Sequence, residues 1–184
     1  DIGDKILLSN GEEICYTKRK KKALREELQK NQELIIAKIS KKKLPLTAEE
    51  YIKLKALALK SAQDFLALYD SVPDKNATAA PERKTFYGQV PRTANEMYEH
   101  TKNVNTYYFA EIAVDECRKR GFESLESNPD FLQNTVRKGS YGEDWSLRKV
   151  LRRFIWHDRI HARAMYRMAI KVFGAENVVN PFCF

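Results

Sequence analysis

The chain has 184 residues, of which 43% are hydrophobic and 32% charged, and it contains only seven glycines and six prolines. This length can bury the core of one domain, and the composition excludes a disordered chain and favours long helices. No apolar run approaches the roughly 20 residues that span a bilayer, and residues 1–10 lack a signal-peptide pattern, so we expect no membrane span and a cytoplasmic location. Because the first residue is not Met, we expect a trimmed chain or a part of a longer protein.

The formal net charge of +8 is unevenly distributed. Residues 145–173 carry a net charge of +7 and residues 1–46 one of +5, which leaves the remainder at −4. Such asymmetry is compatible with an anionic partner, and weak nucleic-acid binding through the basic helices is one alternative function. No base-reading motif accompanies these charges, so solvated helix faces are the preferred interpretation.

The three cysteines, Cys15, Cys117 and Cys183, are far apart in the chain and form no Cys-x-x-Cys motif. Disulfide frameworks and thiolate zinc sites are recognised by paired cysteines at regular spacings. We therefore expect reduced thiols, as is usual for a protein of the cytoplasm.

The first elements expected along the chain are short or highly charged. Residues 5–16 hold two short apolar pieces around Asn10-Gly11, which predicts a small hairpin, an ordered tail or the end of a missing upstream domain. Residues 17–41 are rich in Lys, Leu, Glu and Gln, with apolar residues near helical spacing, which predicts a helix. Pro45 ends this pattern.

Two long helices are expected in the middle of the chain. The stretch Thr47-Ala-Glu-Glu50 has the capping-box pattern, which predicts a helix over residues 48–70. Several prolines and a glycine make residues 71–91 a long connection. A further helix is expected from Thr93 to Arg120, with Gly121 as its stop signal.

A short and a long helix are expected in the last third of the chain. Asn128 as cap and Pro129 at the first helical position predict a short helix over residues 129–138, followed by a loop over 139–144. The last helix is expected over residues 145–173 and is ended by a glycine, Gly174.

Long amphipathic helices with almost no strands imply helices packed on helices. We therefore predict an all-α protein with two parts. Residues 1–46 form an N-terminal extension of hairpin and basic helix, and residues 47–184 form a four-helix bundle.

The chain has only three histidines, and all three are predicted to face the core. His157 and His161 are four residues apart, so they lie one above the other on the same face of the last helix. At about 100° per residue, this face also carries apolar residues such as Phe154 and Met165. His100 shares its helix face with Met97, Val104, Tyr107 and Tyr108. The opposite side of the last helix is expected to carry five arginines: Arg148, Arg152, Arg159, Arg163 and Arg167.

A metal ion explains three inward histidines economically, because an unpartnered polar group in a core is costly. Neutral imidazole is a common ligand for zinc and also suits nickel and iron. We predict that His100, His157 and His161 bind one divalent ion, with nickel or zinc favoured over iron. Three protein ligands leave coordination positions open, as catalytic sites require. Histidines that merely hydrogen-bond to Tyr, Glu or backbone groups are the alternative.

Three polar residues near the histidines are catalytic candidates: Asp158, Glu111 and Tyr107. Ordinary packing or salt bridges are the alternative for each of them. If the metal is structural, Glu111 or Asp158 is the expected fourth ligand. The stretch from His157 to His161 has Asp where zinc proteases have Glu, so a protease is disfavoured.

The stretch Trp145-Ser-Leu-Arg-Lys-Val-Leu151, followed by His157-Asp-Arg-Ile-His161, resembles the last helix of the DinB/YfiT-like superfamily. The stretch Thr93-Ala-Asn-Glu-Met-Tyr-Glu-His100 is similar to the helix that supplies a further histidine in that superfamily. The resemblance covers residues 47–173, and it implies a four-helix bundle whose three histidines bind nickel or zinc. Asp158 stands where relatives often have Glu. The N-terminal extension falls outside the match, and the long connection departs from it.

The same resemblance implies a metal-dependent enzyme, a transferase or hydrolase, that acts on a small molecule. Some members of the superfamily resemble transferases or isomerases that use low-molecular-weight thiols such as mycothiol or bacillithiol, so a thiol is an expected partner. A non-catalytic binding or regulatory bundle with a structural metal is the alternative. A homodimer is compatible with either function, since symmetric dimers are common.

Overall fold

The computed structural model describes residues 5–7, 13–15, 44–85, 88–114 and 118–184 of a chain that divides into two units, Asp1–Lys42 and Lys43–Phe184. In the first unit, β1 (Lys5–Leu7) pairs antiparallel with β2 (Glu13–Cys15), with Lys5 opposite Cys15. The hairpin expected in residues 5–16 is therefore present. The helix expected over residues 17–41 lies outside the described residues.

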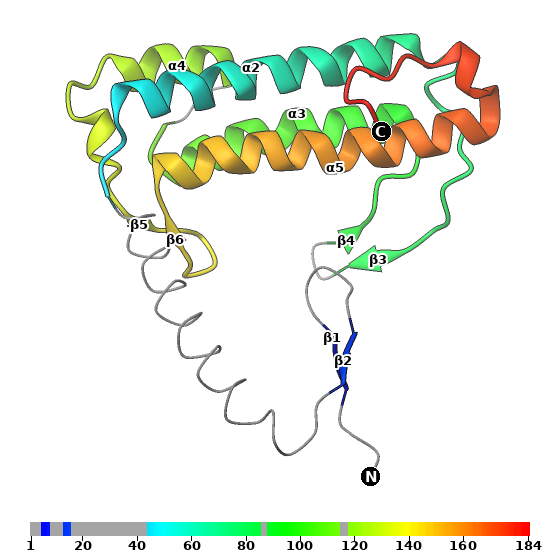
Figure 1. Ribbon diagram of the computed structural model, residues 1–184. Helices are drawn as coiled ribbons and strands as arrows, with labels where there is room; N and C mark the ends of the chain where they lie inside the picture. The colour runs from blue at the N-terminus through cyan, green and yellow to red at the C-terminus, as the bar shows by residue number, and fades with distance from the viewer. Residues whose placement is uncertain (1–4, 8–12, 16–43, 86–87, 115–117) are drawn as a thin grey trace. The chain divides into compact units, whose positions relative to one another are not determined.

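The described part of the second unit is predominantly helical, which confirms the all-α prediction. In Figure 1, α2, α3 and α5 run alongside one another, and α5 packs against both of the others. None of the described helices combines the length and the apolar character needed to cross a membrane. The elements are α2 (Ala48–Ser71), β3 (Lys84–Thr85), β4 (Gly88–Gln89), α3 (Ala94–Ala110), α4 (Arg118–Glu126), the 3₁₀ turn η1 (Phe131–Gln133), β5 (Arg137–Lys138), β6 (Asp144–Trp145), α5 (Leu147–Phe173) and the 3₁₀ turn η2 (Ala175–Asn177).

Two buried clusters form the core, and α5 contributes to both. The first is aromatic, and Phe109, Phe122 and Phe154 meet in it edge to face, with ring centroids 4.9–6.4 Å apart. The second is richer in methionine and includes Met97 of α3 and Met165 of α5. Burial of these large side chains supplies the main driving force for folding, since each contributes roughly 1.5–3 kcal/mol. Because α5 is shared, its register fixes the position of the other helices.

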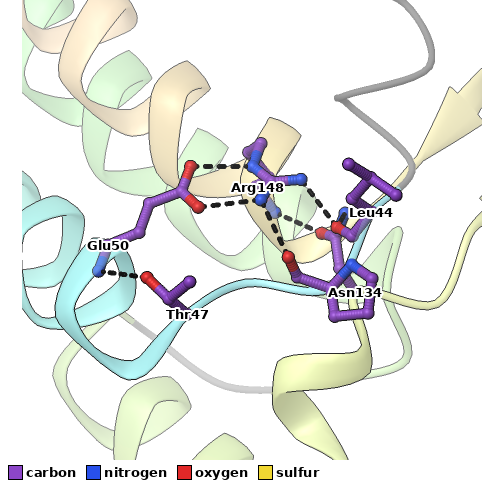
Figure 2. A network of polar contacts seen from close by, with 6 residues as sticks. Leu44, Thr47, Glu50, Asn134 and Arg148 are labelled. Atoms are coloured by element: carbon purple, nitrogen blue, oxygen red, sulfur yellow. Dashed lines mark hydrogen bonds and ion pairs between the residues drawn. The ribbon is translucent and has the colours of Figure 1, made fainter.

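The predicted start of α2 is confirmed, and its first turn leads to an unexpected anchor. The Thr47 hydroxyl accepts a hydrogen bond from the Glu50 backbone N–H at 3.0 Å, as the capping pattern requires. The Glu50 carboxylate binds the Arg148 guanidinium of α5 at 2.8 and 2.9 Å (Figure 2). Arg148 also donates to the carbonyl oxygens of Leu44 and Pro45, at 2.7 and 3.1 Å.

The prediction that Arg148 lies on the solvent side of α5 is therefore wrong, because its side chain is only 6% exposed. The reason is tertiary. The segment before α2 crosses the first turn of α5, and its carbonyl groups replace the water that the guanidinium would otherwise bind. Asn134 completes this network by accepting from the Arg148 backbone N–H and donating to the Leu44 carbonyl, as Figure 2 shows.

The helix predicted from Thr93 to Arg120 is wrong at its end. It begins as expected, with a full capping box between Thr93 and Glu96, but α3 ends at Ala110. Ala113 adopts a positive φ of 65°, which is typical of a helix end, and the Val114 N–H donates a hydrogen bond to the Phe109 carbonyl at 3.0 Å. Gly121 does not stop a helix. It lies inside α4, where a Cβ would come within 2.5 Å of the Phe109 ring.

The short helix predicted over residues 129–138 is reduced to the single 3₁₀ turn η1. Asn134 ends it in the left-handed conformation, with φ of 55°, because its buried side chain is committed to the network around Arg148. The chain then forms the β5–β6 hairpin, where Lys138 pairs with Asp144, so the predicted loop over residues 139–144 loses its last residue to β6. The last helix is close to its prediction, because α5 begins at Leu147 and ends before Gly174.

The predicted long connection between α2 and α3 is confirmed. It contains irregular backbone and the two-residue strands β3 and β4, which pair antiparallel. The Thr78 hydroxyl and the Arg92 side chain tie its two ends together, since Thr78 donates to the Arg92 carbonyl and Arg92 donates to the Ala80 carbonyl. This connection forms one wall of the cavity described below.

Candidate metal centre

The three histidines of the chain come together between α3 and α5. His157 and His161 lie one turn apart on α5, with ring centroids separated by 4.4 Å. His100 reaches them from α3, and its centroid lies 5.1 Å from that of His157 and 4.7 Å from that of His161. The i, i+4 spacing and the packing of α3 on α5 therefore produce the predicted convergence.

The three imidazoles form a group that could hold a metal ion. Each imidazole offers one nitrogen, and the three nitrogens all lie within 4.8 Å of one another. The Nε2 atoms of His157 and His100 are 3.2 Å apart. Two nitrogens that bind one tetrahedral zinc ion at about 2.0–2.1 Å are separated by about 3.3 Å. A hydrogen bond between the two Nε2 atoms accounts for this pair alone and gives no role to His161.

The histidines differ in exposure. His157 is buried, His161 is half-buried and His100 is exposed, so the prediction that all three face the core is wrong for His100. His100, on α3, is therefore the member of the cluster that solvent reaches most easily. The centre thus has a protected inner part and an accessible outer part.

Burial keeps the imidazoles neutral, the state in which they bind metals. Desolvation, reinforced by the neighbouring imidazoles and by Arg118 and Arg153, lowers the pKa of His157 to about 2. Burial and the charge of His100 lower the pKa of His161 to about 4. Burial also lowers the pKa of His100. The site is therefore prepared to accept a cation without first releasing protons at neutral pH.

Aromatic rings hold the inner histidine. Tyr108 meets the His157 ring edge to face, with centroids 5.7 Å apart, and it also contacts Trp145 and Phe154. The Trp156 ring centroid lies 6.4 Å from that of His157, and Trp156 remains half exposed. These contacts restrict the rotation of the imidazole, which a metal ligand requires for a fixed coordination geometry.

Asp158 is held by another partner. Its two carboxylate oxygens accept from the Arg118 guanidinium at 2.5 and 2.8 Å, and one of them also accepts from the Ser61 hydroxyl at 2.5 Å. Arg118 in turn donates to the Ala58 carbonyl and to the Asn105 side chain. This fully paired group joins α2, α3, α4 and α5. Its geometry is that of a structural ion pair and leaves Asp158 neither a metal ligand nor a free base.

Tyr107 lies further along α3, and Glu111 directly follows the last residue of that helix. Eleven residues separate Glu111 from His100, which is about 16 Å along a helix. The Glu111 carboxylate accepts from the Ser140 backbone and hydroxyl at 2.9 and 2.7 Å. Burial opposes the ionisation of Glu111, but hydrogen bonds from Ser140 and Tyr107 outweigh it and lower the pKa. Burial and the bond to Glu111 raise the pKa of Tyr107. This pair fastens the β5–β6 hairpin to α3, and a fourth metal ligand from Glu111 is not favoured.

A cavity of about 370 Å³ opens beside the centre, and His161 is part of its wall. Sequence reasoning missed this cavity, because half of its wall comes from the connection between α2 and α3. Its other wall is α5, which contributes Ala164 and Met168. The cavity also has three cationic side chains: Arg83, Arg167 and Lys171.

Comparisons with protein-family models, with curated proteins and with solved structures return no match to this chain. The resemblance to the DinB/YfiT-like superfamily therefore stays a prediction drawn from short motifs. The arrangement of the site has to be interpreted from its own chemistry, which is that of three convergent neutral imidazoles beside a partly cationic cavity.

Proposed function

We propose that this chain is a metal-dependent enzyme that holds nickel or zinc on His100, His157 and His161. The observation that carries the proposal is the convergence of three imidazole nitrogens within 4.8 Å next to a cavity that His161 also lines. Three protein ligands leave at least one coordination position for water or substrate. In the described residues, Asp158 and Glu111, which were candidates to close that position, are bound elsewhere.

A bound divalent ion would supply Lewis acidity, which polarises a substrate oxygen or lowers the pKa of a substrate thiol. The protein's own contribution is positioning. Tyr108 restricts the His157 ring, and the Arg118–Asp158 pair fixes α5 against α4 at the next residue. The cavity admits a small molecule to the side of the centre where His161 lies. The expected reactions are transfer to or from a small thiol, or hydrolysis.

A bundle of the DinB/YfiT type is part of this proposal. The helical second unit supports it, as do two histidines on the last long helix and one on a preceding helix that packs against it. Two features depart from a compact four-helix bundle. They are the nine-residue length of α4 and the long connection between α2 and α3.

The first experiment measures metal per chain in purified, untagged protein by elemental mass spectrometry. We expect about one nickel or zinc ion per chain, and none in the double variant His157→Ala/His161→Ala. Arg163→Ala, a change at an exposed position of the same helix, is the matched control and should retain the ion. Native protein that binds no ion after incubation with nickel and zinc would refute the proposal.

A second experiment separates an enzyme from a structural metal site. Cobalt(II) is substituted for the native ion, and the ultraviolet and visible absorption spectrum is recorded before and after addition of 2-mercaptoethanol or of azide. An open position predicts a new sulfur-to-cobalt charge-transfer band. A spectrum that is indifferent to thiol and to azide would indicate a closed, structural site.

A further inference from the structure

We infer that the cavity beside His161 binds a small organic anion with an apolar body, whose acid group lies at Arg167 and Lys171 and whose other end points to the histidines. The direction of the second end rests on the proposed function. Binding of the anion rests only on the cavity and its charges. The two parts are therefore tested separately.

The charged residues around the cavity indicate that its ligand is an anion. Arg83, Arg167 and Lys171 all line it and all are exposed, so they lie at its solvent-facing side. Within the part of the chain that the structure describes, none of the three has an acidic partner within 4.0 Å. The cavity lining contains no Asp or Glu. Three cations without a counter-charge around one cavity favour an anionic ligand.

The apolar walls of the cavity indicate that the ligand also has an apolar part. Met97 of α3 and Met168 of α5 are almost fully buried and face the cavity, and Val90 and Pro91 close it from the connection. A ligand that is only an ion, such as phosphate, would leave these walls without a partner. The volume of about 370 Å³ is near the lower end of the range of about 300–1,000 Å³ for small-molecule sites. The ligand is therefore small and partly apolar.

The register of α5 gives the direction. Arg167 follows His161 by six residues, or about 9 Å of helix, and Lys171 follows it by ten, or about 15 Å. Two smaller or apolar residues of α5 also line the cavity: Ala164 lies between His161 and Arg167 in the chain, and Met168 lies between Arg167 and Lys171. A molecule held by its acid group at the two cations extends along this apolar stretch toward His161. Its far end then reaches the candidate metal centre.

Octanoate is the probe, and the sample is protein that has been stripped of metal with EDTA and then dialysed into EDTA-free buffer at low salt. Isothermal titration should detect octanoate binding, with n-octanol and butanoate at least tenfold weaker. The double variant Arg167→Gln/Lys171→Gln should weaken octanoate at least tenfold and leave octanol unchanged. Arg163→Gln is the matched control and should bind octanoate as the native protein does. Equal affinity for octanol and octanoate, or an equal loss in the control, would overturn the anion site.

The three methionines locate the ligand, because the chain contains no others. Met97 and Met168 line the cavity, whereas Met165 is buried in the core and is absent from the lining. In protein labelled with ¹³C at the methionine methyl groups, octanoate should shift the signals of Met97 and Met168 and leave that of Met165 in place. Shifts confined to Met165, or no shift at saturation, would show that the ligand lies elsewhere.

The direction is tested with cobalt-loaded protein and ¹³C-labelled octanoate. Paramagnetic relaxation should be strongest at the methyl end and weakest at the carboxylate. The reverse order would mean that the carboxylate binds the metal, which overturns the orientation and leaves the cavity assignment to the titrations. A protein that binds octanoate but no metal would refute the proposed function while supporting the anion site.

Discussion

Two adjacent residues of α5 have opposite surroundings. Asp158 is 1% exposed and accepts three hydrogen bonds, two of them from a guanidinium that is itself bound to a carbonyl and an amide. His157 is also buried, at 6% exposed, but its Nε2 atom faces the Nε2 atom of another histidine, His100, at 3.2 Å. The hydrogen-bonding capacity of Asp158 is satisfied by other residues of the chain. The ring nitrogens of the histidines instead lie close to one another, within 4.8 Å.

The difference distinguishes structure from binding. A buried polar group that is satisfied by the fold stabilises the arrangement of helices and needs no ligand. Imidazoles whose nitrogens face one another, and whose pKa values are lowered by desolvation, remain available to a cation. The Arg148 network belongs with Asp158 in the first class. The histidines belong in the second, and the following predictions test this division.

The largest change in stability is expected when the buried ion pair between Arg118 and Asp158 is broken. Asp158→Ala leaves the buried Arg118 guanidinium without its counter-charge, which should lower the free energy of unfolding by about 3–5 kcal/mol. Urea denaturation of metal-free protein measures the loss. The double variant Arg118→Met/Asp158→Leu removes both charges and should recover part of it. Native stability of Asp158→Ala would contradict the structural role assigned to this pair.

The next effect belongs to the histidines. Zinc at 100 times its dissociation constant should raise the free energy of unfolding by about 2.7 kcal/mol, because it binds the folded state. Differential scanning calorimetry with zinc and with EDTA measures this gain. His157→Ala should abolish the gain and retain the fold. A zinc-dependent gain that survives in the variant would place the metal somewhere else.

A smaller loss of stability is expected when the hydrogen-bond network around Arg148 is removed. Arg148→Met removes charged hydrogen bonds to Glu50 and to two carbonyl groups, which should lower the free energy of unfolding by about 1.5–3 kcal/mol. The matched variant Arg152→Met lies at an exposed position of the same helix and should change stability by less than about 0.5 kcal/mol. Chemical denaturation of both variants gives the comparison, and equal losses would contradict the burial of Arg148.

The smallest effect concerns protons. His157 and His161 have pKa values in the folded protein below the ordinary value of 6.5, so the unfolded chain takes up more protons in acid. The stability they contribute is fully present above about pH 6.5 and is lost as the pH falls below it, by roughly 1 kcal/mol per histidine down to pH 5.5. Urea titrations of metal-free protein should show this loss, and His157→Ala should reduce it. A flat profile in native protein would indicate that the imidazoles are solvated.

Helix starts were predictable from the sequence because their signals are local. Thr47 and Thr93 cap α2 and α3 through backbone groups three residues away. The end of α3 was not predictable from the same kind of signal. Gly121 looks like a stop signal, but its role is to admit the Phe109 ring, which lies twelve residues earlier in the chain. A contact between residues so far apart in the chain does not change the local pattern of apolar residues from which a helix is predicted.

The histidine cluster was accessible from spacing alone, because i and i+4 positions must share a helix face. Its metal remains a prediction. The partner of Asp158 was not accessible, since Arg118 lies forty positions away on a different helix. The cavity was not accessible either, because Arg83 comes from irregular backbone whose path depends on packing. Of the arginines expected on the opposite side of the last helix, Arg167 lines the cavity, whereas Arg152, Arg159 and Arg163 do not.

The continuity of α5 has a consequence for how this protein can change over evolutionary time. One uninterrupted helix, Leu147–Phe173, holds four residues with different surroundings. Arg148 binds Glu50, His157 faces His100, Asp158 binds Arg118, and Arg167 lines the cavity. Inserting or deleting one residue after Arg148 would turn everything beyond it by about 100° and displace it by about 1.5 Å. Homologous chains should therefore vary α5 by substitution and keep its length constant, while the connection between α2 and α3 absorbs insertions and deletions.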